Sequence, residues 1–144
     1  TPTDDTNLEA LGRMTAFAEA LDARVEVLSP LRHDMAVAVI SHLPHVMSGA
    51  LLGLAEEAHS LLGKLFELAA GSFRDTTRIS DSPPEIWRDI CLTNAEPVSK
   101  AIDGFIDELK QFQSALDAND EEAVMQFFED AAKIREIYKR LSGK

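Results

Sequence analysis

The fold is decided by a stretch that opens with His33-Asp34, continues through Ser41-His42-Leu43-Pro44-His45, and closes with Gly71-Ser72-Phe73-Arg74-Asp75-Thr76-Thr77-Arg78 and Trp87. These motifs hold three of the four histidines of a chain whose formal net charge is -11. Imidazole and guanidinium groups gathered in an otherwise acidic protein are typical of a site that binds an anion.

The histidines are predicted to lie on one long helix of about residues 31–62. His42 and His45 share a face at i, i+3 spacing within an almost wholly apolar run, where polar groups need partners or a ligand. Pro44 removes a backbone hydrogen bond and predicts a bend at about residues 40–44. The alternative is that these histidines are satisfied core residues, because a neutral imidazole needs only one donor and one acceptor.

Downstream of this helix the pattern stays helical, with no further alternating segment longer than a few residues. A short helix is expected near residues 64–70, followed by a loop over 72–83 that Phe73 anchors. Ser82, Pro83 and Glu85 then predict a helix start, with serine as N-cap, proline at the first position and glutamate closing a capping box. That helix carries Trp87.

The last third predicts a helical hairpin with close antiparallel packing, because apolar residues recur at steps of three and four over about 98–116 and again over 124–141. Asn119 is expected to cap the second helix, with Glu122 three residues on. Ile106, Phe128 and Ile137 fall beside the two apolar stripes and widen them. The extra apolar surface indicates that another helix or a second copy of the chain covers the hairpin.

Residues 1–29 differ from the rest. A helical pattern begins at Leu8, and Arg24-Val25-Glu26-Val27-Leu28 alternates like a short strand. One helix and one strand form no sheet, so we interpret residues 1–29 as the end of a dinucleotide-binding domain and residues 30–144 as a helical domain. No Gly-x-Gly-x-x-Gly motif occurs, and therefore no cofactor-binding residue is assigned.

Composition narrows the possible partners. With 144 residues, 45% of them hydrophobic, the chain can bury a core. The negative charge argues against nucleic acid or an anionic membrane as partner. The single cysteine, Cys91, excludes a disulfide within one chain and favours the cytoplasm. No run of consecutive apolar residues approaches the roughly 18 of a spanning helix, and the first residues do not resemble a signal peptide.

Taken together, the three motifs resemble the C-terminal helical domain of the prephenate and arogenate dehydrogenases, over about residues 1–100; residues 100–144 match only as generic helices. The resemblance implies a mainly all-α fold. It would be a dimerisation domain like the C-terminal domain of 6-phosphogluconate dehydrogenase, preceded by one helix and one short strand of a Rossmann domain. It also implies a homodimer and a parent enzyme that oxidatively decarboxylates prephenate or arogenate with NAD or NADP in tyrosine biosynthesis.

The expected substrate is a small dicarboxylate. Arg78 is the best candidate to hold one carboxylate, because a guanidinium matches it with two hydrogen bonds; alternatively, Arg78 pairs with Asp75 in its own segment. The resemblance implies that His45 and Ser41 hydrogen-bond the substrate and that Gly71 allows it close approach. It places His42 in support behind them and assigns a gating role to three residues: Asp34, Asp75 and Trp87.

Trp87 could equally be a plain core or interface aromatic, and His59 is expected at the surface. The family's catalytic histidine belongs to the nucleotide-binding portion, so no catalytic residue is assigned and the 144 residues alone are expected to be inactive. Two rival classes remain: a non-catalytic dimerisation or regulatory module, and a metal-binding protein using His33, Asp34, His42 and His45. The His-x-x-His spacing at a proline kink disfavours the metal, so no metal ligand is assigned.

Overall fold

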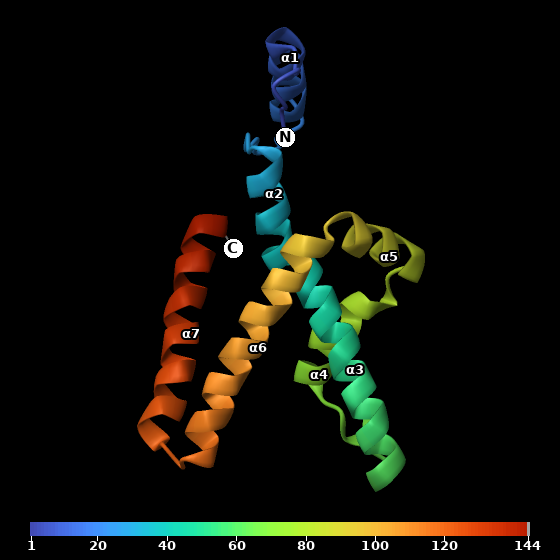
Figure 1. Cartoon of the computed structure of the whole chain (residues 1–144), viewed down its shortest axis with the longest axis vertical. Helices are drawn as coiled ribbons and strands as arrows, with labels where there is room; N and C mark the ends of the chain where they lie inside the picture. The colour runs from blue at the N-terminus through green and yellow to red at the C-terminus, as the bar shows by residue number, and fades with distance from the viewer. Residues whose placement is uncertain (144) are drawn as a thin grey trace. The chain divides into compact units, whose positions relative to one another are not determined.

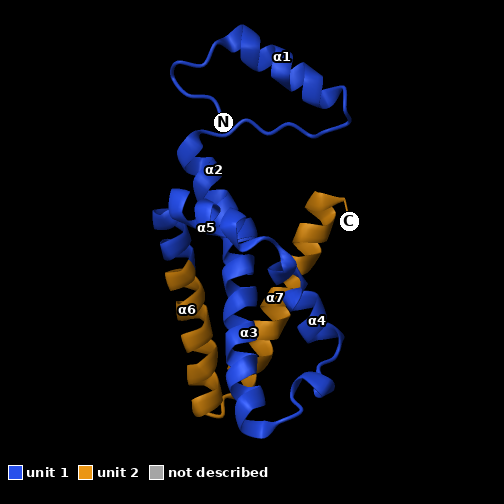
Figure 2. Ribbon diagram, turned by 90° about the vertical axis from the view of Figure 1, so that its right-hand side faces the viewer, with its two compact units in different colours: residues 1–101 blue, residues 102–144 orange. Residues whose placement is uncertain are grey.

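Helices make up all the regular structure in residues 1–143, the part of the chain that the computed structural model describes (Figure 1). The chain divides into two compact units, residues 1–101 and residues 102–144 (Figure 2). The boundary falls inside one helix, α6 (Ala95–Asp117), so the two units share a continuous backbone. Each unit is described by itself below.

The first unit begins with α1 (Leu8–Glu19), capped by Asn7, whose side chain accepts a hydrogen bond from the Ala10 N–H. The strand expected over residues 24–28 is absent from the described chain, and that prediction was wrong. The segment does alternate as extended backbone does: the guanidinium of Arg24 reaches Glu26, two residues on, with Nε 2.9 Å from Oε1. A strand also needs a neighbouring strand to supply ladder hydrogen bonds, and residues 1–143 contain none.

The histidines lie on a continuous helical rod made of α2 (Pro30–Val37), the π-helical turn η1 (Ala38–His42) and α3 (Leu43–Leu62) (Figure 1). The long helix predicted from the sequence is therefore present. Its π-helical turn over residues 38–42 overlaps the range of 40–44 in which Pro44 predicted a bend. Proline lacks an N–H and its ring crowds the carbonyl four residues back. The wider π turn accommodates both effects, with the Leu43 N–H donating to the Ala38 carbonyl, five residues back.

The rod ends at Gly63, whose φ of +64° is a conformation that residues with a Cβ adopt only under strain. By length and composition alone, Pro30–Leu62 could cross a membrane, with a mean hydropathy of 1.5 over its most apolar window. Core helices of water-soluble proteins pass the same test. Only 22% of that window is buried, although two polar side chains of the rod, His42 and Ser48, are buried and hydrogen-bonded to other parts of unit 1.

Two predictions for the next segment were wrong. The short helix expected near residues 64–70 is only the 3-10 turn η2 (Phe66–Leu68), and the expected loop over 72–83 is mostly helical, as α4 (Gly71–Thr77) and the 3-10 turn η3 (Arg78–Asp81). Both α4 and η3 lie against α3. Packing on that apolar rod supplies the stabilisation that this polar sequence lacks locally. Phe73 is half-buried there.

The helix that carries Trp87, α5 (Pro84–Thr93), is present but starts one residue later than predicted. Ser82 does not cap it, because its hydroxyl instead donates to the carbonyl of Ile79, 2.9 Å away, and so closes η3. Pro83 takes the cap position and Pro84 the first helical position, where its missing N–H costs no hydrogen bond. Asn94 separates α5 from α6.

Unit 2 is the predicted helical hairpin, formed by the rest of α6 and by α7 (Glu121–Ser142). Asn119 does not cap α7, because it holds the left-handed conformation, with φ +51°, that ends α6. Asp120 is the cap, with Oδ1 accepting from the Ala123 N–H at 3.0 Å. Three aromatic rings, those of Phe112, Phe127 and Phe128, pack together near the turn.

The close packing expected along the whole hairpin is not present. A hollow of about 660 Å³ lies between α6 and α7, lined by residues from Phe105 to Ile134, and α7 buries none of its side chains. The apolar stripe of α7 is left open, with Ile134 66% and Leu141 69% exposed. Apolar surface of this extent needs a covering partner.

Candidate functional site

Unit 1 contains a pocket of about 470 Å³ between α3, η3 and α5. Its walls combine apolar side chains with a few polar groups, which is the composition of small-molecule sites. Eleven residues line it: His45, Val46, Gly49, Leu52, Ile79, Ser80, Ser82, Pro84, Trp87, Arg88 and Cys91. Its volume is in the range of pockets that take small organic ligands.

His45 and Trp87 form one wall of this pocket. Their rings are stacked, with centroids 3.3 Å apart and planes 22° from parallel. His45 Nδ1 lies 3.1 Å from the Ser41 carbonyl oxygen, and because a carbonyl can only accept, Nδ1 carries the hydrogen. Nε2 of neutral His45 is therefore left with a lone pair, able to accept a hydrogen bond from a ligand hydroxyl.

Ser48, which is fully buried next to the pocket, holds the lining residue Ser80 in place. Its hydroxyl lies 2.6 Å from the Ser80 hydroxyl and 3.3 Å from the Thr77 carbonyl oxygen. Thr77 in turn donates from Oγ1 to the Phe73 carbonyl at 2.8 Å. These bonds attach η3 to α3 and so set the position of Ser80 in the pocket.

His42 lies next to Trp87, outside the pocket lining. It is buried, and its ring centroid is 6.3 Å from that of Trp87 in an edge-to-face arrangement. Burial lowers the pKa of His42 below its ordinary value of 6.5; the nearby His33 and His45 lower it further, and the carboxylate of Asp34 opposes them. His42 is therefore neutral at physiological pH.

This lowered pKa predicts a pH-dependent stability. The folded chain binds fewer protons at His42 than the unfolded chain between the lowered pKa and about 6.5, so acidification through that window favours unfolding. We expect the free energy of unfolding to fall as the pH drops below about 6.5, and to fall less steeply in His42→Gln. Urea titrations across that range measure it; parallel curves for the two proteins would contradict it.

Three of the predicted substrate-binding residues, Arg78, Gly71 and Ser41, lie outside the pocket lining. Arg78 is exposed at the start of η3, immediately before the lining residues Ile79 and Ser80, and Gly71 begins α4. Arg78 makes no ion pair with Asp75 or any other acid within residues 1–143. Ser41 touches the site through its backbone carbonyl.

The gating candidates are spread over unit 1. Trp87 lies in the pocket wall, whereas Asp75 is exposed on α4. Asp34 pairs with its neighbour His33, with Oδ1 3.0 Å from Nδ1. His59 is not a plain surface residue as predicted: it is half-buried, stacks on Phe66 and accepts a hydrogen bond at Nδ1 from the Leu65 N–H.

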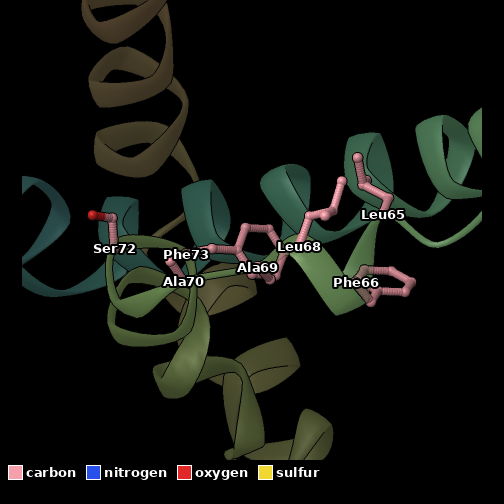
Figure 3. Close-up of a pocket in the computed structure, with 7 residues that line it drawn as sticks. All are labelled: Leu65, Phe66, Leu68, Ala69, Ala70, Ser72 and Phe73. Atoms are coloured by element: carbon pink, nitrogen blue, oxygen red, sulfur yellow. The ribbon is translucent and has the colours of Figure 1, made fainter.

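A second hollow, of about 350 Å³, lies along the segment between α3 and the first turn of α4 (Figure 3). Apolar side chains line nearly all of it, including Leu65, Leu68 and Phe73. It holds no charged group, so it offers nothing to bind a carboxylate. Among residues 1–143, no three histidine, cysteine or acidic side chains lie close enough together to hold a metal ion.

Several residues of the site escaped the sequence analysis. Ser48 and Ser80 look like ordinary polar residues in the sequence, because their pairing joins positions 32 residues apart. Arg88 lines the pocket, although its Nε already donates to Asp89 at 2.8 Å. Asn94 also looks like an ordinary polar residue, and nothing in the sequence shows that its side chain reaches His42.

Fold and pocket together define an all-helical domain that pairs a histidine- and aromatic-walled pocket with an open apolar hairpin. Residues 29–130 match the family described as "Prephenate dehydrogenase, dimerization domain", and the chain belongs to that family. The resemblance found in the sequence motifs is thereby confirmed, and the family's description implies a homodimer.

Comparisons with individual relatives support the same family assignment. The cyclohexadienyl dehydrogenase of Zymomonas mobilis is 34% identical over 137 residues, which cover 94% of this chain and 46% of that protein. The crystal structure of prephenate dehydrogenase from A. aeolicus in complex with hydroxyphenyl propionate and NAD+ matches with a TM-score of 0.88 and 35% identity, over 96% of this chain and 48% of that one. Synechocystis arogenate dehydrogenase matches with a TM-score of 0.84 and 28% identity, over 96% and 50%. The chain thus spans about half the length of these relatives.

Proposed function

We propose that this chain is the substrate-binding and dimerisation part of a prephenate dehydrogenase. The observation that carries the proposal is the family match over residues 29–130, to which the pocket between α3, η3 and α5 adds a place for a small ligand. The complete enzyme would convert prephenate and NAD(P)+ to 4-hydroxyphenylpyruvate, carbon dioxide and NAD(P)H in tyrosine biosynthesis.

The pocket suits a small ring with polar substituents. Trp87, Ile79 and Leu52 offer apolar surface, and Nε2 of His45 offers an acceptor for a hydroxyl. Arg78, at the edge of η3 and without an acidic partner in residues 1–143, would supply the cation for a carboxylate. Ser41 and Gly71 would complete the contacts to the substrate, with His42 supporting His45 from behind.

Asp34, Asp75 and Trp87 would close the pocket. Trp87 already lies in its wall, and the two aspartates would take part in the polar contacts that close it. The 144 residues contain no glycine-rich turn that fits the phosphates of a dinucleotide, so we assign NAD(P) binding and the catalytic histidine to a nucleotide-binding domain. The chain alone would then be inactive.

The homodimer interface would be the open stripe of the α6–α7 hairpin. It is apolar and uncovered along α7, from Phe128 to Leu141, and a second copy presents the same surface. A stable two-fold interface of this kind typically buries more than about 1,200 Å².

A second candidate substrate is arogenate. The match to Synechocystis arogenate dehydrogenase is nearly as good as that to the A. aeolicus enzyme, with TM-scores of 0.84 and 0.88. Arogenate carries an amine where prephenate carries a keto group, and no acid lines the pocket to receive an ammonium. The charge of the lining therefore favours prephenate.

A chimaera tests the proposal. The chain would be joined to the part of the Zymomonas mobilis cyclohexadienyl dehydrogenase that it does not cover, and NADH formation would be followed with prephenate and with arogenate. We expect turnover of prephenate by the chimaera and none by the chain alone.

The outcomes are distinct. Turnover of arogenate but not prephenate would support the second candidate. A chimaera that folds, dimerises and binds NAD+ but turns over neither compound would contradict both, and would favour a non-catalytic dimerisation module. Dimerisation is measured separately by sedimentation, so loss of the dimer is not mistaken for loss of the pocket.

A further inference from the structure

Asn94, at the junction of α5 and α6, makes two hydrogen bonds that span unit 1. Its Nδ2 lies 2.9 Å from the Asp34 carbonyl oxygen on α2 and 3.2 Å from His42 Nδ1 in the π turn. The two partners are 60 and 52 residues away in sequence. Asn94 and His42 are both buried, with 8% exposure each, so neither can exchange these bonds for water without cost.

The partners determine the orientation of the amide. The Asp34 carbonyl can only accept, so the atom that faces it must be the NH2 group of Asn94 and not its oxygen. The second hydrogen of that NH2 group then points to His42. His42 Nδ1 must accept it, which requires the neutral imidazole whose hydrogen is on Nε2.

His45, one turn away, has the opposite arrangement. Its Nδ1 donates to the Ser41 carbonyl, so His45 carries its hydrogen on Nδ1. Two histidines three residues apart are thus held in different tautomers, each by a different group. His42 and His45 both lie against Trp87, so the state of His42 bears directly on the wall of the pocket.

We propose that Asn94 is a positioning residue: its NH2 group holds His42 in the Nε2–H tautomer and fastens the π turn to the α5–α6 junction, which together set the place of Trp87. No group within the described chain replaces it in both bonds. The burial of His42 also favours the neutral ring, because it disfavours the charged form, which donates from both nitrogens.

The test is nitrogen NMR of the imidazole rings in the 144-residue chain without ligand, at neutral pH. Nδ1 is expected to be unprotonated in His42 and protonated in His45. His59 is a third reference, because its Nδ1 accepts from the Leu65 N–H and is therefore also unprotonated. A native spectrum in which His42 carries its hydrogen on Nδ1 would overturn the proposal, and this measurement needs no variant.

The variant Asn94→Asp then tests whether Asn94 is what fixes the tautomer of His42. A carboxylate has the same shape but only accepts, so it cannot donate to His42 or to the Asp34 carbonyl. We expect the His42 Nδ1 signal to move to the protonated range while His45 and His59 keep theirs. An unchanged His42 signal in the folded variant would overturn the proposal. Asn94→Gln keeps the NH2 group and is expected to leave the His42 Nδ1 signal closer to the native one than Asn94→Asp does.

The link from Asn94 to substrate rests on the proposed function and is measured apart from it. In the chimaera, Asn94→Asp is expected to raise KM for prephenate with a smaller change in kcat, because the pocket wall moves while the chemistry lies elsewhere. An inactive chimaera would count against the proposed function alone. The tautomers in the ligand-free chain decide the role of Asn94 independently.

Discussion

Replacement of Arg78 by alanine is expected to weaken binding of the dicarboxylate substrate about ten- to a hundred-fold. Hydrogen bonds to a charged group contribute about 1.5–3 kcal/mol, and each 1.4 kcal/mol is a tenfold change in affinity. The effect would appear in KM and in kcat/KM of the chimaera measured with prephenate. The free energy of unfolding should hardly change, because Arg78 is exposed and makes no ion pair within residues 1–143.

Two neighbouring arginines serve as controls for Arg78. Arg88 lines the pocket but pairs with Asp89, and Arg74 lies one turn before Arg78 on α4, exposed and away from the pocket lining. Arg74→Ala is expected to leave KM unchanged. Arg88→Ala should raise KM at most a few-fold, since an exposed guanidinium that already pairs with an acid contributes little free energy to ligand binding.

Arg78→Lys distinguishes charge from geometry. Lysine keeps the positive charge but cannot make the parallel pair of hydrogen bonds that a guanidinium makes with a carboxylate. An intermediate KM is therefore expected. A larger loss in Arg88→Ala than in Arg78→Ala would contradict the assignment and would make Arg88, the cation in the pocket wall, the carboxylate-binding residue.

Replacement of Trp87 by alanine is expected to lower the free energy of unfolding by about 2–3 kcal/mol. Fully buried tryptophans cost about 3–5 kcal/mol when truncated, and Trp87 is only half-buried. The change also removes the stack on His45, which contributes part of that loss. Unfolding must be followed by far-UV circular dichroism in urea, because Trp87 is the single tryptophan of the chain.

Trp87→Phe is the matched variant. It keeps an aromatic face for His45 and most of the apolar volume, so about half of the lost stability should return. Leu92→Ala provides the background, since Leu92 lies on the same helix, is 70% exposed and should cost less than about 0.5 kcal/mol. If Trp87→Ala were as mild as Leu92→Ala, the stack would contribute nothing to the fold.

The sequence predicted the helices where the apolar period is long. The rod over residues 30–62, the hairpin of α6 and α7, and the interruption near Pro44 all follow from period and from proline. The predictions failed where local signals competed. Ser82 and Asn119 have the chemistry of helix caps, but one closes the preceding 3-10 turn and the other ends the preceding helix.

The residues of the candidate site were likewise predicted only in part from the sequence. The motifs predicted that His45 and Trp87 belong to one site, and the structure stacks them in one wall. The motifs did not predict Ser48, Ser80 or Asn94. Serine and asparagine occur throughout loops and helix ends, so their pattern carries no signal of a distant partner.

For this protein, the sequence alone determined the helical class, the family and the irregularity of the long helix near Pro44. That the motif residues bind a dicarboxylate stays a prediction. Only the tertiary structure decided that the polar segment over residues 71–81 is helical, that residues 24–28 form no strand, and which hydrogen bonds orient His42. The physical reason is the distance along the chain over which each interaction acts. Helical period and proline act over a few residues of the chain. The packing of α4 and η3 on α3, the lack of a pairing strand within residues 1–143 and the hydrogen bond from Asn94 to His42 depend instead on groups far apart in sequence.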